Sequence, residues 1–404
     1  MIQRELYMKR IRPFIGKDVI KVMTGIRRSG KSVMLELIKK ELAAFGTDPA
    51  HMISINFEDM RYAPLLTAES LHAYIQKEVQ TIEGKVYLFF DEIQEVDRWE
   101  KCINSFRVEF DCDIYITGSN AKLLSGELAT YLGGRYVEFV IYPFSLSEFQ
   151  DAYRMLYPNA SLRDIFHQYL TSGGMPYLGN LRYEDAPCRQ YLVDVFNSIL
   201  LKDIIKRNKI RDPDLLQRIL TYVITNIGTT FSASTISKFL KSERRNVAPE
   251  TILNYLRYCM DACLFYQAKR HDLAGKQILS TNEKYYIADH GIREAVYGGN
   301  MRDIHLILEN MVFMEMLRRG YTVTVGKTGD KEIDFVGEKQ GNRIYVQVTY
   351  LLATEETIQR EFGVYKNIQD NFPKYVVSMD DLDLSRDGIR HRHIADFLTM
   401  ENWD

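Results

Sequence analysis

At 404 residues the chain is too long for one typical domain, and this length favours roughly two to four. Its 46% hydrophobic residues can bury a sizeable core, and no apolar stretch approaches the length of a membrane span. With 52 Lys and Arg against 54 Asp and Glu, the net charge of -2 argues against a globally basic nucleic-acid binder, although a local basic face is compatible with it.

The five cysteines are scattered and lack the partner pair that would complete a zinc site. They favour buried free thiols, which suit a reducing cytosol. Residues 1–6 are charged and contain no signal-type apolar core. We therefore expect a soluble, cytoplasmic protein that does not associate with a membrane.

A strand-loop-helix pattern opens the chain. Residues 19–24 are a β-branched run that predicts a buried strand, and residues 33–42 place apolar side chains at helical spacing. The segment between them fits the phosphate-loop pattern GxxxxGK[ST] at every fixed position: Gly25, Ile26, Arg27, Arg28, Ser29, Gly30, Lys31 and Ser32.

In this context the loop's backbone N–H groups and the following helix N-terminus face phosphate oxygens. Lys31 would reach the β- and γ-phosphates, and the Ser32 hydroxyl would bind Mg²⁺. Arg27 and Arg28 are candidates for phosphate contact, with solvent exposure as the alternative for one of them. The segment predicts a nucleoside-triphosphate site; a glycine turn with a solvated lysine is the alternative.

Strand-like and helix-like segments then alternate up to about residue 150. Short apolar or β-branched runs occupy residues 52–57, 87–90, 114–117 and 136–141, and helical patterns occupy 71–80 and 99–110. The alternation predicts an α/β fold in which helices cover a parallel sheet.

Polar residues adjoin three of these strands. Asp91 and Glu92 end a hydrophobic strand, where the Asp of a P-loop protein holds Mg²⁺ and a following Glu can orient or deprotonate water. Ser119 and Asn120 follow another strand and could contact the γ-phosphate or the lytic water; we favour Asn120, with a turn or a helix N-cap as the alternative. Arg135 is either an arginine finger for a neighbouring subunit or a surface salt-bridge residue.

Helical spacing dominates residues 147–208, with a break at 172–176. Residues 211–290 then show three helical patterns followed by two strand-like runs, the outline of a winged helix-turn-helix. Local positive charge in this region allows phosphate contact with DNA, although such residues are equally often solvated and winged helices also bind proteins. The basic residues are Lys238, Lys241, Arg244, Arg245, Arg257, Lys269 and Arg270.

Together these motifs resemble an AAA-type ATPase family of bacteria and archaea. The resemblance rests on residues 24–32, 91–94, 117–120, 134–135, 142–145 and 173–176 in this order. It implies an ATPase domain over residues 1–146 with strand order 5-1-4-3-2, a helical connector over 147–210, a winged helix over 211–290 and a PD-(D/E)XK nuclease-like domain over 291–404. It also implies ATP and Mg²⁺ as ligands, with catalytic roles for Lys31, Glu92, Asn120 as a sensor and Arg135 as a finger in a homo-oligomer.

The C-terminal region departs from the nuclease pattern. Such a nuclease needs an Asp, then an acidic residue and a Lys one position apart on the next strand, to bind metal and activate water. Glu309 and Asp334 are present, but Gln347 stands where the second acid belongs and Thr349 where the lysine belongs. A neutral Gln is a poor ligand for a hard cation, so we expect a degenerate site.

The sequence thus predicts a Mg²⁺-dependent ATPase whose nucleotide state drives a C-terminal half that engages DNA or a protein partner. A slow ATP-binding conformational switch and an ATP-regulated nuclease are the two alternatives.

Overall fold

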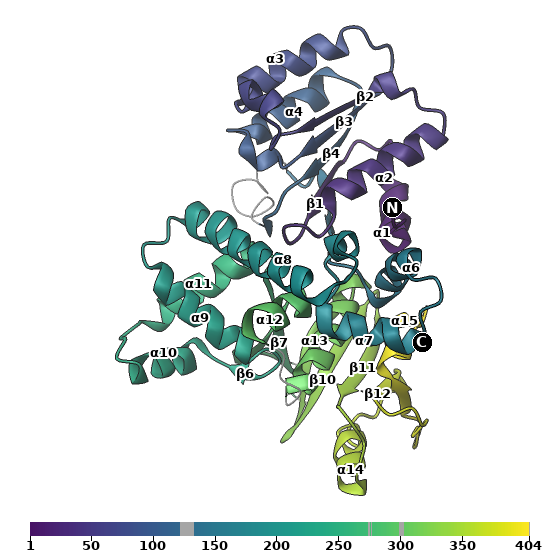
Figure 1. The fold of residues 1–404 in the computed structure, drawn as a ribbon, viewed down its shortest axis with the longest axis vertical. Coiled ribbons are helices and arrows are strands. Elements are labelled where there is room, and N and C mark those ends of the chain that lie inside the picture. The colour runs from purple at the N-terminus through teal and green to yellow at the C-terminus, as the bar shows by residue number, and fades with distance from the viewer. Residues whose placement is uncertain (122–132, 274, 276, 299–302, 404) are drawn as a thin grey trace. The chain divides into compact units, whose positions relative to one another are not determined.

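The structure, a computed structural model, describes residues 1–121, 133–273, 275, 277–298 and 303–403. The chain forms two compact units: Met1–Pro143 with Asp261–Cys263, and Phe144–Met260 with Leu264–Asp404. Figure 1 shows the elements of both units. Within the described residues, no helix is both long enough and apolar enough to cross a membrane.

The described part of the first unit holds a five-stranded parallel sheet. Its strands are β1 (Ile20–Thr24), β2 (Met52–Asn56), β3 (Val86–Asp91), β4 (Cys112–Thr117) and β5 (Tyr136–Val140). They lie in the order β2-β3-β4-β1-β5, which reads 5-1-4-3-2 from the other edge. The helices are α1 (Glu5–Ile11), α2 (Lys31–Ala44), α3 (Ala68–Val79) and α4 (Trp99–Glu109), with short 3-10 turns η1 (Arg12–Phe14), η2 (Pro49–His51), η3 (Met60–Leu65) and η4 (Ile93–Glu95).

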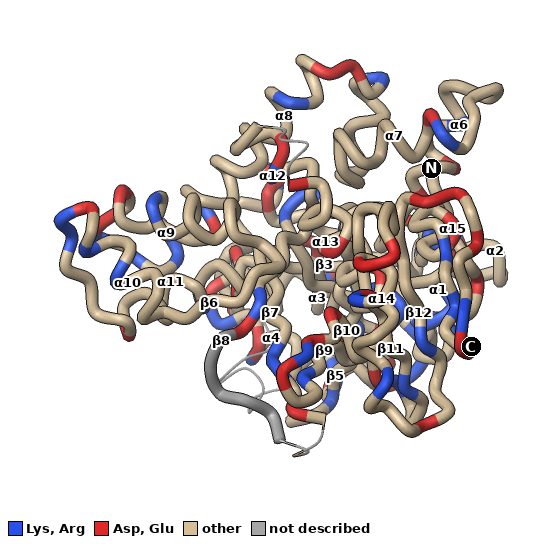
Figure 2. Tube along the Cα trace, turned by 90° about the horizontal axis from the view of Figure 1, so that it is seen from below, with Lys and Arg blue, Asp and Glu red and all other residues tan. Residues whose placement is uncertain are grey.

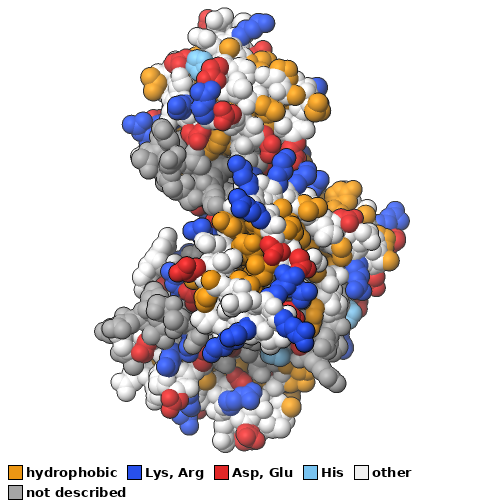
Figure 3. Space-filling view, turned by 90° about the vertical axis from the view of Figure 1, so that its left-hand side faces the viewer, with side chains coloured by type: hydrophobic (Ala, Val, Ile, Leu, Met, Phe, Trp, Pro, Cys, Tyr) orange, Lys and Arg blue, Asp and Glu red, His pale blue; other side chains and the backbone are white. Residues whose placement is uncertain are grey.

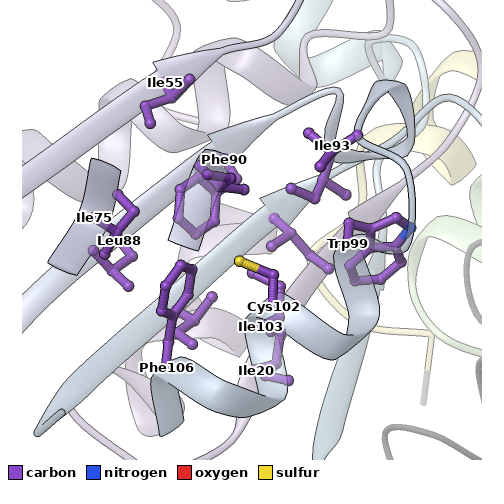
Figure 4. Packing of buried hydrophobic residues seen from close by; sticks show 14 of the residues in the cluster. Ile20, Ile55, Ile75, Leu88, Phe90, Ile93, Trp99, Cys102, Ile103 and Phe106 are labelled. Carbon is purple, nitrogen blue, oxygen red and sulfur yellow. The ribbon is translucent and has the colours of Figure 1, made fainter. Parts of the chain in front are cut away.

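Helices cover both faces of this sheet, which explains the near-continuous apolar strands. Leu88 and Phe90 of β3 pack with Ile75 of α3 and Phe106 of α4 in the core shown in Figure 4. The intervening Phe89 points to the other face, where Lys39 of α2 lies over its ring at 5.8 Å. The predicted α/β fold with a parallel sheet is therefore confirmed for this unit.

The second unit begins with helices and ends in a mixed sheet. Its helices are α6 (Leu146–Leu156), α7 (Leu162–Ser172), α8 (Asp185–Ser198), α9 (Pro213–Thr225), α10 (Ala233–Ser242), α11 (Pro249–Asp261), α12 (His290–Tyr297), α13 (Ile304–Arg318), α14 (Glu355–Gly363) and α15 (Ile394–Thr399), with a 3-10 turn η6 (Pro176–Leu181) and a π-helical segment η7 (Ile199–Lys206). Ser145 starts α6 with a capping box, because its side chain accepts from the Glu148 N–H while the Glu148 carboxylate accepts from the Ser145 N–H.

Among the described residues, the sheet of this unit has eight strands in the order β13-β12-β11-β10-β9-β7-β8-β6. They are β6 (Thr230–Phe231), β7 (Phe265–Asp272), β8 (Gln277–Ile287), β9 (Thr322–Thr328), β10 (Lys331–Lys339), β11 (Asn342–Val348), β12 (Lys374–Ser378) and β13 (Arg390–His393).

One sheet crosses the boundary that the sequence places at residues 290 and 291. The antiparallel hairpin β7–β8 follows the three helices α9, α10 and α11, as predicted, but β7 also pairs in parallel with β9. The segments predicted as separate modules over 147–210, 211–290 and 291–404 thus belong largely to one compact unit, and the hairpin is part of the C-terminal sheet. Backbone pairing of β7 with β9 joins residues 211–290 to residues 291–404. The periodicity of side chains along a strand does not indicate which strand will pair with it, so the sequence does not predict this pairing.

Candidate functional site

The predicted phosphate loop connects β1 to α2, and its two glycines adopt backbone conformations that other residues avoid. Gly25 has φ +134°, and a Cβ atom there would lie 2.3 Å from the Ile141 carbonyl oxygen. Gly30 has φ 98° and is the N-cap of α2. Glycine is therefore required for both the turn and the close backbone approach, and the loop ends at the electropositive end of a 14-residue helix.

Two polar side chains of the loop are buried. Lys31 is 4% exposed, and its Nζ donates to the Gly25 and Ile26 carbonyls at 3.1 Å each. The Ser29 hydroxyl is fully buried and has no hydrogen-bond partner within the described residues. A phosphate oxygen is the kind of acceptor that would satisfy both groups, so the loop is chemically suited to a polyphosphate.

Asp91, at the end of β3, is held by two hydroxyls. Thr117 donates to its Oδ1 at 2.5 Å, and the Ser32 side chain also hydrogen-bonds to it. Burial raises the pKa of Asp91, although these two hydrogen bonds act in the opposite direction. The Ser32 hydroxyl and the Asp91 carboxylate are hard oxygen ligands that fit Mg²⁺. In P-loop proteins phosphate oxygens and water complete the coordination of such an ion.

Glu92 follows Asp91 in the left-handed region, at φ 56°. Its N–H donates to Thr117 Oγ1 at 2.9 Å, and its Oε2 accepts from the side chain of Gln94. Strained conformations of this kind occur where surrounding contacts over-determine the backbone. Thr117 therefore fixes both neighbouring acids at once.

Asn120 lies just after β4. This strand lies between β3, which ends at Asp91, and β1, which precedes the phosphate loop. β4 pairs in parallel with β3 on one side and β1 on the other, so its carboxyl end lies beside both Asp91 and the loop. The Gly118 N–H donates to Met23 O at 3.1 Å, which holds this tip against β1. Asn120 is 4% exposed. Residues 122–132, which follow Asn120 and bear on the alternative N-cap role, lie outside the described residues.

Arg135 lies at the amino end of the strands, whereas the phosphate loop lies at their carboxyl end. It directly precedes β5, whose first residue Tyr136 is in register with Ile20, and the Ile20 N–H donates to Arg135 O at 3.0 Å. The loop follows the other end of β1, about 16 Å away at the usual rise per residue. The exposed Arg135 side chain therefore does not reach the loop of its own chain.

Arg27 and Arg28 of the loop differ in exposure and contacts, and the sequence did not predict that Arg4 contacts the loop. Arg27 forms an ion pair with Glu58 at 3.2 Å, while Arg28 has φ 68° and is exposed. Arg4 is 2% exposed and donates to Ser29 O at 2.8 Å, which anchors the loop from outside the motif. It also donates to Tyr142 O at 2.7 Å. No local pattern marks Arg4, because its acceptors are distant backbone carbonyls.

The four residues of the predicted nuclease-like site, Glu309, Asp334, Gln347 and Thr349, are all buried in the second unit, each between 7% and 9% exposed. Gln347 Oε1 accepts from the Asp334 N–H at 3.2 Å. Burial, followed by the negative charge of Glu309, raises the pKa of Asp334 to about 7. Sequence reasoning missed Lys284, whose Nζ lies 2.9 Å from Glu309 Oε1.

Part of the predicted basic surface is neutralised. Arg245 forms ion pairs with Asp212 and Asp214, and Arg270 with Glu332 at 3.4 Å. In Figure 2, Lys and Arg alternate with Asp and Glu around α9 and α10. Figure 3 shows both charge signs interspersed with apolar side chains on its face, as expected from the near-neutral net charge.

Residues 17–150 match the family model of an AAA domain, and residues 163–303 match a domain of unknown function. An uncharacterised protein of Haemophilus influenzae is 38% identical over 400 residues, which is 98% of each chain. An uncharacterised protein of Methanocaldococcus jannaschii is 30% identical over 424 residues, covering 100% of this chain and 91% of that one.

Among solved structures, the Thermotoga maritima RuvB Holliday junction branch migration motor aligns with a TM-score of 0.35 and 15% identity, covering 66% of this chain and 88% of that chain. At that TM-score the similarity adds nothing about substrate or partner.

Proposed function

We propose that this chain hydrolyses ATP with Mg²⁺ in its AAA-type P-loop ATPase domain. The chain belongs to the family of its Haemophilus influenzae and Methanocaldococcus jannaschii relatives. The observation that carries the proposal is the Thr117 hydroxyl, which bonds both Asp91 and the Glu92 backbone. A metal ligand and a water-orienting carboxylate are thereby held together beside the phosphate loop.

Each group has a separate task in this proposal. The loop amides and Lys31 neutralise the negative charge of the phosphates. Electrostatic stabilisation of this kind, together with positioning, supplies most of the catalysis of phosphoryl transfer. Ser32 and Asp91 hold Mg²⁺, which offsets charge that develops on the phosphate oxygens. Glu92 orients the attacking water, and Gln94 sets the direction of its carboxylate.

The test replaces Glu92 by Gln and measures both nucleotide binding and steady-state turnover. The amide keeps the shape of the side chain but cannot accept a proton, so ATP affinity should be retained while turnover falls by about 10²-fold or more. The nearby Glu95 is exposed and offers a matched control, since Glu95→Gln makes the same chemical change and should leave turnover intact. Full hydrolysis by the Glu92→Gln variant would remove Glu92 from the proposed mechanism.

For the second unit, the proposal is a winged helix that engages DNA or a protein partner. β6 pairs with β8 next to the three helices α9, α10 and α11, an arrangement that supports a winged-helix assignment. Five basic side chains of the predicted set are exposed: Lys238, Lys241, Arg244, Arg257 and Lys269. Measuring the ATPase rate with and without duplex DNA separates the two partner classes, because only a DNA-coupled enzyme should be stimulated, with an effect that falls as salt rises.

The position of Arg135 bears on assembly. Since it lies at the amino end of the strands, away from its own loop, we propose that it serves a neighbouring subunit's nucleotide in a homo-oligomer. The specific ATPase rate should then increase with protein concentration. Arg135→Ala should abolish that increase without weakening ATP binding, and a rate independent of concentration would assign Arg135 to the surface instead.

A slow ATP-binding switch is the competing function. Gln94 already occupies one oxygen of Glu92, which would delay water activation until the carboxylate is released. Single-turnover and steady-state rates distinguish the two: a switch gives slow chemistry in both assays, whereas a motor gives rapid turnover once its partner is added.

A further inference from the structure

The buried site of the second unit gathers four carboxylates from three elements. Glu309 comes from α13, Glu332 and Asp334 come from β10, and Glu361 comes from α14. A nuclease-like fold would use such a cluster to bind a divalent metal, because carboxylates are its preferred ligands. In this chain, positively charged or hydrogen-bond-donating groups must balance the negative charge of the four carboxylates.

A lysine from a different part of the fold enters the cluster. The Nζ atom of Lys284, on β8, lies 2.9 Å from Glu309 Oε1, 3.0 Å from Glu332 Oε1 and 3.4 Å from Asp334 Oδ1. Only 4% of this lysine is exposed. The ammonium group donates hydrogen bonds to Glu309 and Asp334 and forms an ion pair with Glu332, so three carboxylates meet it at the place where a metal would be shared.

Other donors also reach these carboxylates. The Tyr286 hydroxyl donates to Glu309 Oε1 at 2.6 Å, and the Val348 N–H donates to Asp334 Oδ2 at 2.9 Å. Arg270 forms an ion pair with Glu332 at 3.4 Å. Both oxygens of Asp334 and both oxygens of Glu332 thus have partners without a metal, whereas the same acids without these contacts would repel one another.

The neutral residue in the second-acid position is oriented away from metal binding. Gln347 Oε1 accepts from the Asp334 N–H at 3.2 Å, and Gln347 Nε2 donates to Glu361 Oε2 at 2.9 Å. Its amide oxygen is thus committed to the backbone, and its amide nitrogen faces the fourth carboxylate. In the part of the chain that the structure describes, no group of three or more His, Cys, Asp and Glu side chains can hold a metal ion. The residues present do not fit the metal that a nuclease-like fold would imply.

We propose that the Lys284 ammonium is the resident cation of this cluster and replaces a divalent metal. The ion pairs join β8, the second strand of the β7–β8 hairpin, to α13 and β10 of the C-terminal region. The cluster therefore works as an internal clamp between the proposed winged helix and the nuclease-like core, and it does not cleave nucleic acid. Burial alone lowers the pKa of Lys284, but the attraction of Glu309, Asp334 and Glu332 outweighs burial and raises it, so the ammonium stays charged.

The experiment counts Mn²⁺ ions bound to the full-length, nucleotide-free chain by electron paramagnetic resonance. The wild type should bind no Mn²⁺ that depends on Asp334, so wild type and Asp334→Asn should give the same count. Lys284→Met removes the ammonium and exposes its carboxylates to the ion, and this variant should gain one Mn²⁺ per chain. The double variant Lys284→Met/Asp334→Asn should lose it again, which separates this site from the phosphate loop.

Lys284→Arg is the matched control, because it keeps the positive charge and should gain no Mn²⁺. If Lys284→Met folds only when Mn²⁺ is added, that rescue supports the proposal directly. If Lys284→Met folds neither with nor without Mn²⁺, the Mn²⁺ counts of the wild type and Asp334→Asn decide whether the proposal holds. Binding of Mn²⁺ to the wild type that disappears in Asp334→Asn would overturn the proposal, as would a folded Lys284→Met that binds no additional ion. None of these readouts depends on ATP hydrolysis.

Discussion

Replacing Thr117 by Val tests the arrangement of the nucleotide site most directly. The two side chains have nearly the same shape and are both β-branched, so strand β4 keeps its propensity and no cavity opens. What is lost is one hydroxyl that is fully buried, accepts from the Glu92 N–H at 2.9 Å and donates to Asp91 Oδ1 at 2.5 Å.

The size of the effect follows from these two hydrogen bonds. A neutral hydrogen bond contributes about 1 kcal/mol to stability and one to a charged group about 1.5–3 kcal/mol, so Thr117→Val should lower the free energy of unfolding by roughly 3 kcal/mol. The pKa of Asp91 should also increase, because the Thr117 hydrogen bond is the largest influence that lowers it. Mg²⁺-dependent turnover should therefore decline, and its pH profile should move to more alkaline values.

Urea unfolding and a steady-state ATPase assay over a pH series measure these effects. Thr117→Ser is the control: it keeps the hydroxyl and loses one methyl group, which costs about 1 kcal/mol, and its pH profile should match the wild type. A Thr117→Val protein with wild-type stability and an unmoved pH profile would refute the bridging role of this hydroxyl.

Three further outcomes are expected. Gly25→Ala should abolish nucleotide binding in a filter assay, because its Cβ would meet a backbone carbonyl at 2.3 Å, whereas Gly16→Ala, with φ +75° but nothing within 4 Å, should retain it. Arg4→Met leaves buried carbonyls without their donor and should cost about 2–4 kcal/mol by thermal unfolding, while the exposed Lys9→Met should cost almost nothing. Burial and then the charge of Glu309 raise the pKa of Asp334 from 3.8 to about 7, so the folded state holds this proton more tightly than the unfolded state. The contribution of Asp334 to the free energy of unfolding should therefore decrease as pH rises from about 4 to 7. The pH dependence of the free energy of unfolding of Asp334→Asn should lack this decrease.

Much of the first unit could be predicted from the sequence. Its strands and helices appear within a few residues of the expected positions, because strands buried on both faces are almost continuously apolar and the helices between them keep their period. The phosphate loop is equally local: its eight residues are contiguous, and the glycine positions follow from backbone geometry. The roles of Asn120 and Arg135 remain predictions, although the sheet places Asn120 beside the loop and Arg135 at the other end of the strands.

The second unit was harder to predict, since its organisation depends on strand neighbours. The helices and the β7–β8 hairpin were foreseen from periodicity, but the parallel pairing of β7 with β9 was not. The basic residues illustrate the same limit: Arg245 and Arg270 look free in the sequence, yet acids distant in the chain neutralise both.

Residue type at a fixed local spacing was enough to indicate the phosphate loop and the acidic pair at the end of β3, and it predicts a degenerate site at Gln347 and Thr349. How these groups are held in place became visible only in the folded chain. Thr117 joins the two acids across strands, and Lys284 meets carboxylates that are 25 and 50 residues away along the chain. Such contacts leave no local pattern, since they form only when the sheet brings distant strands together.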